Sequence, residues 1–358
     1  MYWLVTIKKY GQLRSCEDRT YHLTQRGIII ALNSKTGQLL WKRKTTPSAN
    51  GICVSKSGIY TLSAEGVFSK RDPLTGHLQL HLKVDDVSEP LHYSYGNLEM
   101  IGTSSGVICL SSGCVFMING ENGELVWKFS EDDTTLVGMS LCMEKSLVTG
   151  INKNRGRAIL FVVNISTGRL EKSFDLGQAI SISPPGILSD IAYFTVFQAG
   201  VDNLWIGEFM QLELPEMLLL RRKEILYNTQ LEAFPILFAG KICYSSLLEA
   251  GKTGAYEKGG YIHCRGIGTP ETSDLKFRTI GNPFPLIAGW GEFVVAGCSD
   301  GYIYCYDLTA KKEKFQLYVN RRIQTKPTIF DQCVICASDG ALFRISLNTG
   351  SIIWKFVF

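Results

Sequence analysis

The sequence predicts an all-β fold, a closed β-propeller of about eight four-stranded antiparallel blades, with seven blades as the alternative. Three observations predict it. One sequence phrase recurs along the chain, adjacent copies lie about 40–47 residues apart, and helical periodicity is poor throughout. A repeat of this length is the size of one propeller blade. The 358 residues therefore hold about eight such blades.

The recurring phrase predicts two strands joined by a tight turn. Its first copy, GIIIALNSKTGQLLW, runs from Gly27 to Trp41. Alternation of apolar residues with a period of two is typical of a strand that buries one face. Asn33 is expected to begin the turn, because its side chain can accept hydrogen bonds from backbone amides two residues further on. Gly37 suits the positive φ that such a turn requires.

Further copies follow in chain order, and each predicts one blade. Clear copies begin at residues 66, 113, 159, 300 and 339, and weaker copies begin at residues 204 and 259. Another apolar run precedes the phrase in each unit, so that each unit contains four strands. One sheet cannot bury both of its faces, whereas stacking sheets around a ring covers them and removes exposed edges. We therefore expect residues 1–358 to form a single propeller domain.

The least regular part of the chain is residues 202–268, where we expect irregular blades with long loops. The segment from Glu213 to Asn228 predicts a strand, a loop and a strand, with a short helix as the alternative. Long loops in a regular array are often functional. An apolar run lies beside basic residues here and predicts a partner-binding surface, formed by Leu218, Leu219, Arg221 and Arg222. The alternative is that the leucines belong to an ordinary strand.

The phrase resembles the tryptophan-docking motif of pyrroloquinoline-quinone-type propellers. Its consensus, Ala-x-Asp-x-x-Thr-Gly-x-x-x-Trp, is matched by Ala31, Asn33, Thr36, Gly37 and Trp41. The resemblance covers most of the chain and fails between about residues 175 and 275. It implies that the docking tryptophans pack between neighbouring blades, at Trp41, Trp127 and Trp354.

The resemblance also raises the possibility of a quinone-dependent dehydrogenase. Such enzymes hold the quinone between a Trp and a disulfide of adjacent cysteines, beside a cation bound by carboxylate and amide oxygens. The sequence has no adjacent pair of cysteines and no comparable cluster of acids and amides. We therefore expect no cofactor and no metal, and we assign no catalytic residue.

The predicted function is a non-enzymatic interaction or scaffold module that binds a partner protein through loops on one propeller face. The alternative is a small-molecule-binding protein or an enzyme with its site at the mouth of the central channel. A deep funnel lined by convergent acids, histidines or arginines would favour the alternative, and an apolar plug would favour the module.

Charge and composition predict the kinds of partner and the cellular location. The net charge is +4, and basic clusters such as Lys42-Arg43-Lys44 are short and isolated, so we expect no nucleic-acid partner. No segment approaches the ~18–20 apolar residues of a membrane span. The N-terminal apolar stretch is followed directly by Lys8-Lys9 and does not resemble a signal peptide. Eleven cysteines at irregular spacing predict reduced thiols. We expect a cytoplasmic protein, monomeric as a folded unit.

Overall fold

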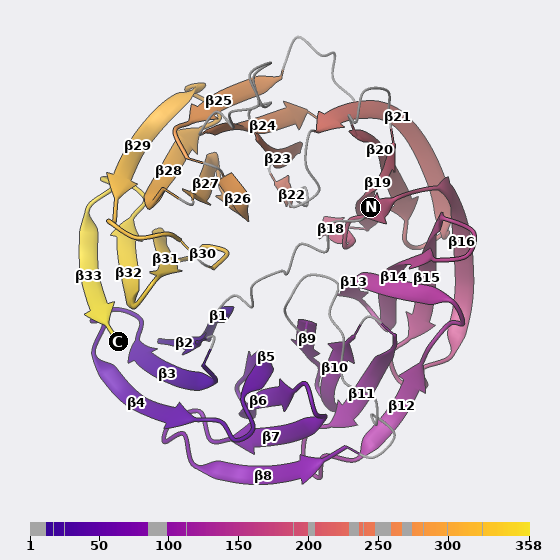
Figure 1. The fold of residues 1–358 in the computed structure, drawn as a ribbon, viewed down its shortest axis with the longest axis horizontal. Coiled ribbons are helices and arrows are strands. Elements are labelled where there is room, and N and C mark those ends of the chain that lie inside the picture. The colour runs from indigo at the N-terminus through magenta and orange to yellow at the C-terminus, as the bar shows by residue number, and fades with distance from the viewer. Residues whose placement is uncertain are drawn as a thin grey trace. The chain divides into compact units, whose positions relative to one another are not determined.

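The protein is an eight-bladed β-propeller (Figure 1), seen here in a computed structural model. The structure describes residues 12–16, 18–24, 26–84, 99–111, 113–188, 190–199, 205–228, 236–238, 240–247, 259–266, 274–281, 283–298, 300–323 and 325–358. The strands within these ranges form eight antiparallel sheets, each made of strands consecutive in the sequence. The prediction of about eight blades is confirmed, and the seven-bladed alternative is wrong.

The first compact unit comprises Met1–Arg155 and Ile159–Asp175. It holds the first four sheets, apart from residues 157–158 and 176–178 of the fourth sheet. Their strands are β1 (Gln12–Cys16), β2 (Arg19–Leu23), β3 (Ile28–Asn33) and β4 (Leu39–Lys44); β5 (Ala49–Ser55), β6 (Gly58–Ser63), β7 (Val67–Arg71) and β8 (Leu78–Lys83); β9 (Glu99–Gly102), β10 (Gly106–Leu110), β11 (Val115–Asn119) and β12 (Leu125–Phe129); and β13 (Thr134–Cys142), β14 (Lys145–Asn152), β15 (Arg157–Asn164) and β16 (Leu170–Gln178).

The second compact unit comprises Gly156–Ala158 and Leu176–Phe358. Its strands are β17 (Ser181–Ile182), β18 (Gly186–Leu188), β19 (Ile191–Ala199), β20 (Trp205–Glu213) and β21 (Leu218–Asn228); β22 (Ile236–Phe238), β23 (Lys241–Leu247), β24 (Gly260–Gly266) and β25 (Leu275–Thr279); β26 (Pro283–Trp290), β27 (Phe293–Cys298), β28 (Tyr302–Asp307) and β29 (Lys312–Tyr318); and β30 (Thr328–Phe330), β31 (Cys333–Ser338), β32 (Ala341–Ser346) and β33 (Ile352–Val357).

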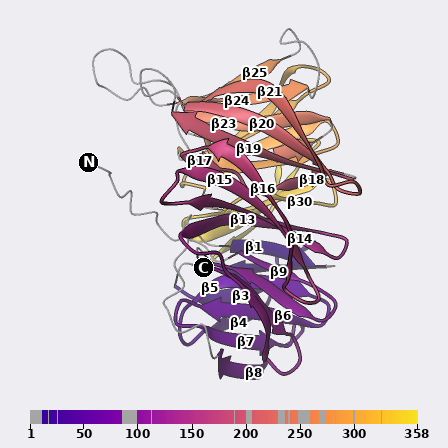
Figure 2. The ribbon, with the colours of Figure 1, turned by 90° about the vertical axis from the view of Figure 1, so that its right-hand side faces the viewer.

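Within each unit the sheets follow one another side by side. The first strand of each sheet lies on the inner side and the last strand on the outer side (Figure 1). The inner strands of successive sheets contact one another, as β1 contacts β5 and β5 contacts β9. Figure 2 shows the sheets of the first unit from the side.

The fifth sheet departs from the predicted four strands, because its inner strand is divided in two. Both β17 and β18 pair with β19, and Ser183, Pro184 and Pro185 separate them. Proline has no backbone N–H to give to a sheet, so the two prolines interrupt the edge strand. Ser183 keeps the broken strand attached, since its backbone N–H donates to the carbonyl of Thr195 at 2.9 Å.

The segment from Glu213 to Asn228 contains a strand end, a turn and a strand, as expected. Glu213 ends β20, a short turn follows, and residues 218–228 form β21, whose pairing with β20 shifts register between Arg221 and Ile225. The alternative of a short helix is wrong, and the leucines lie in strand β21, which leaves their predicted role in binding untested. Met217 adopts a left-handed backbone conformation in the turn (φ 50°), where five of the six regular copies place glycine.

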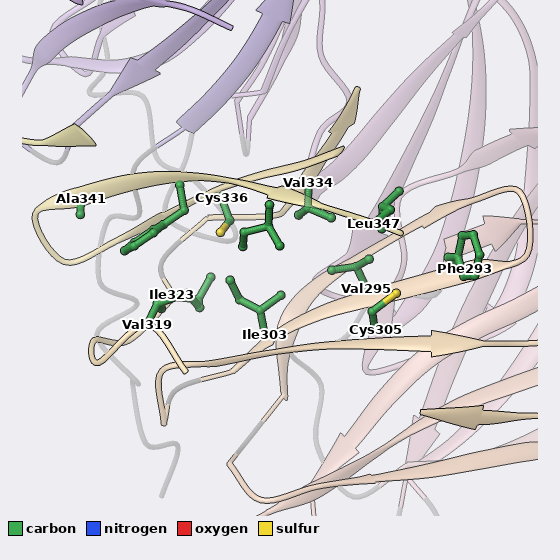
Figure 3. Close-up of a cluster of buried hydrophobic side chains, with 12 residues drawn as sticks. Phe293, Val295, Ile303, Cys305, Val319, Ile323, Val334, Cys336, Ala341 and Leu347 are labelled. Carbon is green, nitrogen blue, oxygen red and sulfur yellow. The ribbon is translucent and has the colours of Figure 1, made fainter. Parts of the chain in front are cut away.

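The core consists of apolar layers between successive sheets. Figure 3 shows the layer between the seventh and eighth sheets, where Val295 and Ile303 face Val334 and Cys336. Corresponding layers lie between the first and second sheets and between the second and third. Burial of each aliphatic side chain contributes about 1.5–3 kcal/mol. Neighbouring sheets therefore stabilise each other, as the repeat predicts.

Candidate functional site

The turn between the third and fourth strands of a sheet is the most regular polar feature of the chain. In the first copy, Asn33 Oδ1 accepts hydrogen bonds from the backbone N–H groups of Lys35 and Thr36, at 3.0 and 2.9 Å. The backbone N–H of Gly37 then donates to the carbonyl of Asn33 at 2.9 Å. The same side-chain bonds recur at Asp72, Asn119, Asn164 and Asp307. The predicted turn chemistry is confirmed.

Several of these turns receive a side chain from the preceding sheet. The indole N–H of Trp41 donates to the carbonyl of Pro73 at 3.1 Å, and that of Trp127 donates to the carbonyl of Ile165 at 2.6 Å. Both carbonyls belong to the residue directly after the Asp or Asn that begins the turn. A Cβ on Gly168 would lie 2.6 Å from the ring of Trp127, so only glycine allows the ring to approach this closely. Trp41, Trp127 and Trp354 are buried and are core residues, as the motif implies.

The predicted partner-binding residues lie at the start of β21, the last strand of the fifth sheet. Leu218 is 51% exposed, whereas Leu219 is half-buried. The backbone of Arg221 pairs with Met210 of β20, and Arg222 follows it in the same strand. The side chains of the two arginines lie outside the described residues. The structure therefore places all four residues in one strand, and their role in binding stays a prediction.

The alternative prediction, a small-molecule site at the mouth of the channel, concerns the polar side chains on the inner strands. Gln12 of β1 accepts a hydrogen bond from the backbone N–H of Ile52 at 3.0 Å. Glu99 of β9 accepts one from the backbone N–H of Met139 at 3.3 Å. Burial lowers the pKa of the Arg14 guanidinium, and the nearby Glu99 carboxylate opposes this shift. Gln12 and Glu99 thus link neighbouring inner strands, and a small-molecule site there stays a prediction.

Burial holds several cysteine thiols in their protonated form. Burial raises the pKa of Cys53 to about 11, and it raises the pKa of Cys305 and of Cys336 to about 12. The thiolate is the nucleophilic form and the metal-binding form of cysteine, so these side chains act as small apolar core residues at neutral pH. Among the described residues, no group of three or more His, Cys, Asp or Glu side chains could hold a metal ion.

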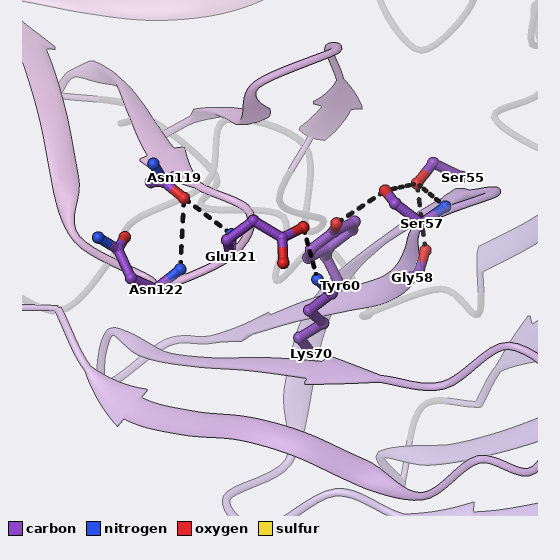
Figure 4. A network of polar contacts seen from close by, with 8 residues as sticks. All are labelled: Ser55, Ser57, Gly58, Tyr60, Lys70, Asn119, Glu121 and Asn122. Carbon is purple, nitrogen blue, oxygen red and sulfur yellow. Dashed lines mark hydrogen bonds and ion pairs between the residues drawn. The ribbon is translucent and has the colours of Figure 1, made fainter.

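One buried cation of the second sheet is neutralised by the third sheet (Figure 4). Lys70 Nζ lies 2.9 Å from Glu121 Oε1 and 5.9 Å from the centre of the Tyr60 ring. Glu121 is positioned by the turn, because its backbone N–H donates to Asn119 Oδ1 at 2.8 Å. This pair shows how the chain compensates a buried charge.

Arg43 and Arg71 were not predicted as site residues. Both lie beside the turn of the second sheet, Arg43 at the end of β4 and Arg71 at the end of β7. Arg71 Nη1 donates to the carbonyl of Gly76 at 3.1 Å, and its Nη2 donates to the carbonyl of Lys44 at 3.4 Å. Arg43 Nη2 donates to the carbonyl of Thr75 at 3.4 Å. Arg71 is buried and Arg43 is exposed. A comparison of the repeats position by position could have identified them, because the other regular copies carry apolar residues at both positions.

Comparisons with known proteins agree with this geometry. The family model described as "Outer membrane protein assembly factor BamB" matches residues 3–172. Among solved structures, the computationally designed Ika8 protein is 12% identical, with a TM-score of 0.66 over 98% of this chain and 97% of that one. BamB from Moraxella catarrhalis is 14% identical, with a TM-score of 0.61 over 95% and 92%. Apo AztD from Citrobacter koseri is 11% identical, with a TM-score of 0.58 over 92% of each chain.

At these identities the solved structures establish the fold alone. No curated protein matches the sequence. Within the described part of the chain, no helix has the length and apolar character needed to cross a membrane.

Proposed function

Because residues 3–172 match a model of the β-propeller family built from pyrroloquinoline-quinone-type repeats, we propose that the chain is a non-enzymatic module that binds a partner protein through loops on one propeller face. The matched family model carries the name of an outer membrane protein assembly factor, and such a function requires contact with other proteins. A fold of this kind hosts many unrelated functions, so the proposal depends on particular surface residues.

The observation that carries the proposal is the exposure of Leu218 at the turn end of the β20–β21 hairpin. This hairpin departs most from the repeat, since Met217 replaces the turn glycine and β21 extends over 11 residues. An apolar side chain that is 51% exposed would gain free energy if a partner covered it. Arg221 and Arg222 follow in the same strand and would supply the basic rim of such an interface.

The proposal is tested by cross-linking the tagged full-length chain in its source cell and identifying the partner by mass spectrometry. We expect Leu218→Asp, and separately the double variant Arg221→Glu/Arg222→Glu, to lower partner recovery at least fivefold. Leu170→Asp is the matched control, because Leu170 is also exposed (43%) and also begins the last strand of its sheet. Equal recovery with all variants would show that β21 is not the binding surface.

We also propose that the protein works in a reducing compartment, the cytoplasm. None of its eleven cysteines, all of which lie among the described residues, forms a disulfide. Nine of the eleven are buried. Proteins of oxidising compartments instead use cysteines mainly as disulfides.

A further inference from the structure

Six copies of the phrase are regular, and their turn-forming Asp, Asn or Ser stands at positions 33, 72, 119, 164, 307 and 346. The residue before it is apolar and buried in five of the six. These five residues are Leu32, Ile118, Val163, Tyr306 and Ile345, all at most 2% exposed. In the second copy the residue is Arg71, which is only 9% exposed. A charged group at a core position costs free energy unless it is compensated. The second copy therefore carries a charge at a position that is apolar in the other five copies.

A second position that is apolar in the other copies is also arginine here, and this arginine is near enough to Arg71 to lower its pKa. Six residues after the turn glycine, or after Lys311 in the seventh copy, the other copies carry Leu82, Phe129, Phe174, Leu317 and Phe356. The first copy carries Arg43 there. Its stem lies over Gly76, since a Cβ on that glycine would be 3.1 Å from Arg43 Cγ. Leu82 lies over Gly123 of the next copy in the same way.

The two arginines interact only with neutral acceptors among the described residues. All the hydrogen bonds of Arg43 and Arg71 go to backbone carbonyls, those of Lys42, Lys44, Thr75 and Gly76. Arg71 Nε is buried without a hydrogen-bond partner. Burial lowers the pKa of Arg71, and the neighbouring Arg43 lowers it further.

The adjacent carboxylate does not neutralise this pair. Asp72 Oδ1 accepts the backbone N–H groups of Leu74 and Thr75 and the Thr75 hydroxyl, so it serves the turn. Other buried cations of the chain do have carboxylate partners. Lys70 pairs with Glu121, Arg265 with Asp274 and Arg344 with Asp331, at 2.9–3.3 Å.

We propose that Arg43 and Arg71 form a binding site for a phosphate-type oxyanion, either inorganic phosphate or a phosphate ester. Guanidinium groups present planar pairs of N–H donors that match the oxygens of phosphate. Phosphate and its monoesters carry about 1.5 to 2 negative charges at neutral pH, whereas a carboxylate carries one. Two uncompensated cations therefore favour phosphate.

The test is isothermal titration calorimetry of the full chain with inorganic phosphate at constant ionic strength, with chloride as the balancing anion. We expect saturable binding at one site, weakened at least tenfold by Arg71→Ile and by Arg43→Leu. Both variants restore the residue type of the other copies. Arg169→Leu is the matched control, because Arg169 is exposed and follows the turn glycine of the fourth copy. It should change the affinity less than twofold.

Thermal unfolding in two buffers distinguishes an anion-binding role of Arg71 from a purely structural one. In chloride alone, Arg71→Ile should unfold at the same temperature as the wild type or higher, and phosphate should no longer raise that temperature. If Arg71 is merely structural, the variant will be less stable in both buffers, and the proposal is wrong. Should Arg71→Ile fail to fold, Arg43→Leu decides alone, because Arg43 is exposed.

The class of anion is decided by competition. Sulfate should displace phosphate, and acetate at the same concentration should not. Equal binding of acetate would contradict the preference for a phosphate-type anion. Absence of saturable heat with wild-type protein would overturn the site altogether.

Discussion

At the scale of single residues, the chain depends on an indole that reaches from one sheet into the turn of the next. Trp127 combines a buried ring with a hydrogen bond to the carbonyl of Ile165. The ring also fills the space that Gly168 leaves open. Loss of this side chain removes both apolar contact and a partly buried hydrogen bond, so its effect should exceed that of an ordinary core truncation.

We predict that Trp127→Ala lowers the free energy of unfolding by about 3–5 kcal/mol. The measurement is urea-induced unfolding followed by circular dichroism. Trp290→Ala serves as control, since Trp290 is 43% exposed, and it should cost less than about 1 kcal/mol. Equal losses in the two variants would contradict a docking role for Trp127.

Residue-level features were predictable from the sequence where a pattern repeats and not where it is broken. Asn33 and Gly37 could be assigned to a turn because few residue types accept a hydrogen bond from a backbone amide two residues further on, and few adopt a positive φ. The pairing of Lys70 with Glu121 could not be predicted, because it joins two different copies over 51 positions of sequence. Arg71 could have been found, since its position in the repeat is apolar elsewhere.

At the scale of elements, the seventh copy contains a turn that is less favourable than the others. Lys311 occupies the position of the turn glycine and adopts φ 55°, whereas Gly37 and Gly350 adopt φ 73° and 72°. A side chain in this conformation costs about 1 kcal/mol relative to glycine. The seventh copy thus carries backbone strain at a residue that its strands do not require.

We predict that Lys311→Gly raises the free energy of unfolding by about 1 kcal/mol. Thermal unfolding monitored by calorimetry would detect this as a higher midpoint. Lys312→Gly is the matched control, because Lys312 is exposed and begins β29 with ordinary strand geometry. It should destabilise by about 0.5–1 kcal/mol. Destabilisation by both variants would show that φ at Lys311 is not strained.

The elements that the sequence failed to predict lie in the fifth sheet, where turn signals are replaced by less specific residues. Pro184 and Pro185 divide its inner strand, and Met217 forms a tight turn without glycine. The length of β21 was missed because Leu218 and its neighbours form a continuous apolar run rather than an alternating one. A short continuous run does not distinguish strand from loop or helix by periodicity.

At the scale of the whole molecule, the positions of the cysteines indicate the redox conditions under which the fold is stable. Most of its cysteines lie in the apolar layers between sheets, such as Cys109 in one layer and Cys336 in another. Cys16 and Cys142 are half-buried. Oxidation of a buried thiol would place a polar group or a cross-link in a packed layer.

We predict that protein isolated from its source cell with an alkylating agent present contains eleven reduced thiols after denaturation. Reaction of the native protein with the same reagent should reach at most Cys16 and Cys142, because the other thiols are buried. Mass spectrometry of the alkylated peptides distinguishes the two states. Recovery of disulfide-linked peptides would contradict the proposed cytoplasmic location.

The eight-bladed architecture was predictable because the copies share one spacing, and the spacing fixes how many sheets the chain can hold. Each described sheet is also made of consecutive strands, and none borrows a strand from elsewhere in the sequence. As the ribosome releases the chain, the hydrogen-bond ladder of a sheet needs no partner that is still unsynthesised. The contacts within each sheet are local in sequence, which favours rapid formation. The sheets can therefore form one after another during translation. The apolar layer between two sheets forms only after the second of them has been synthesised.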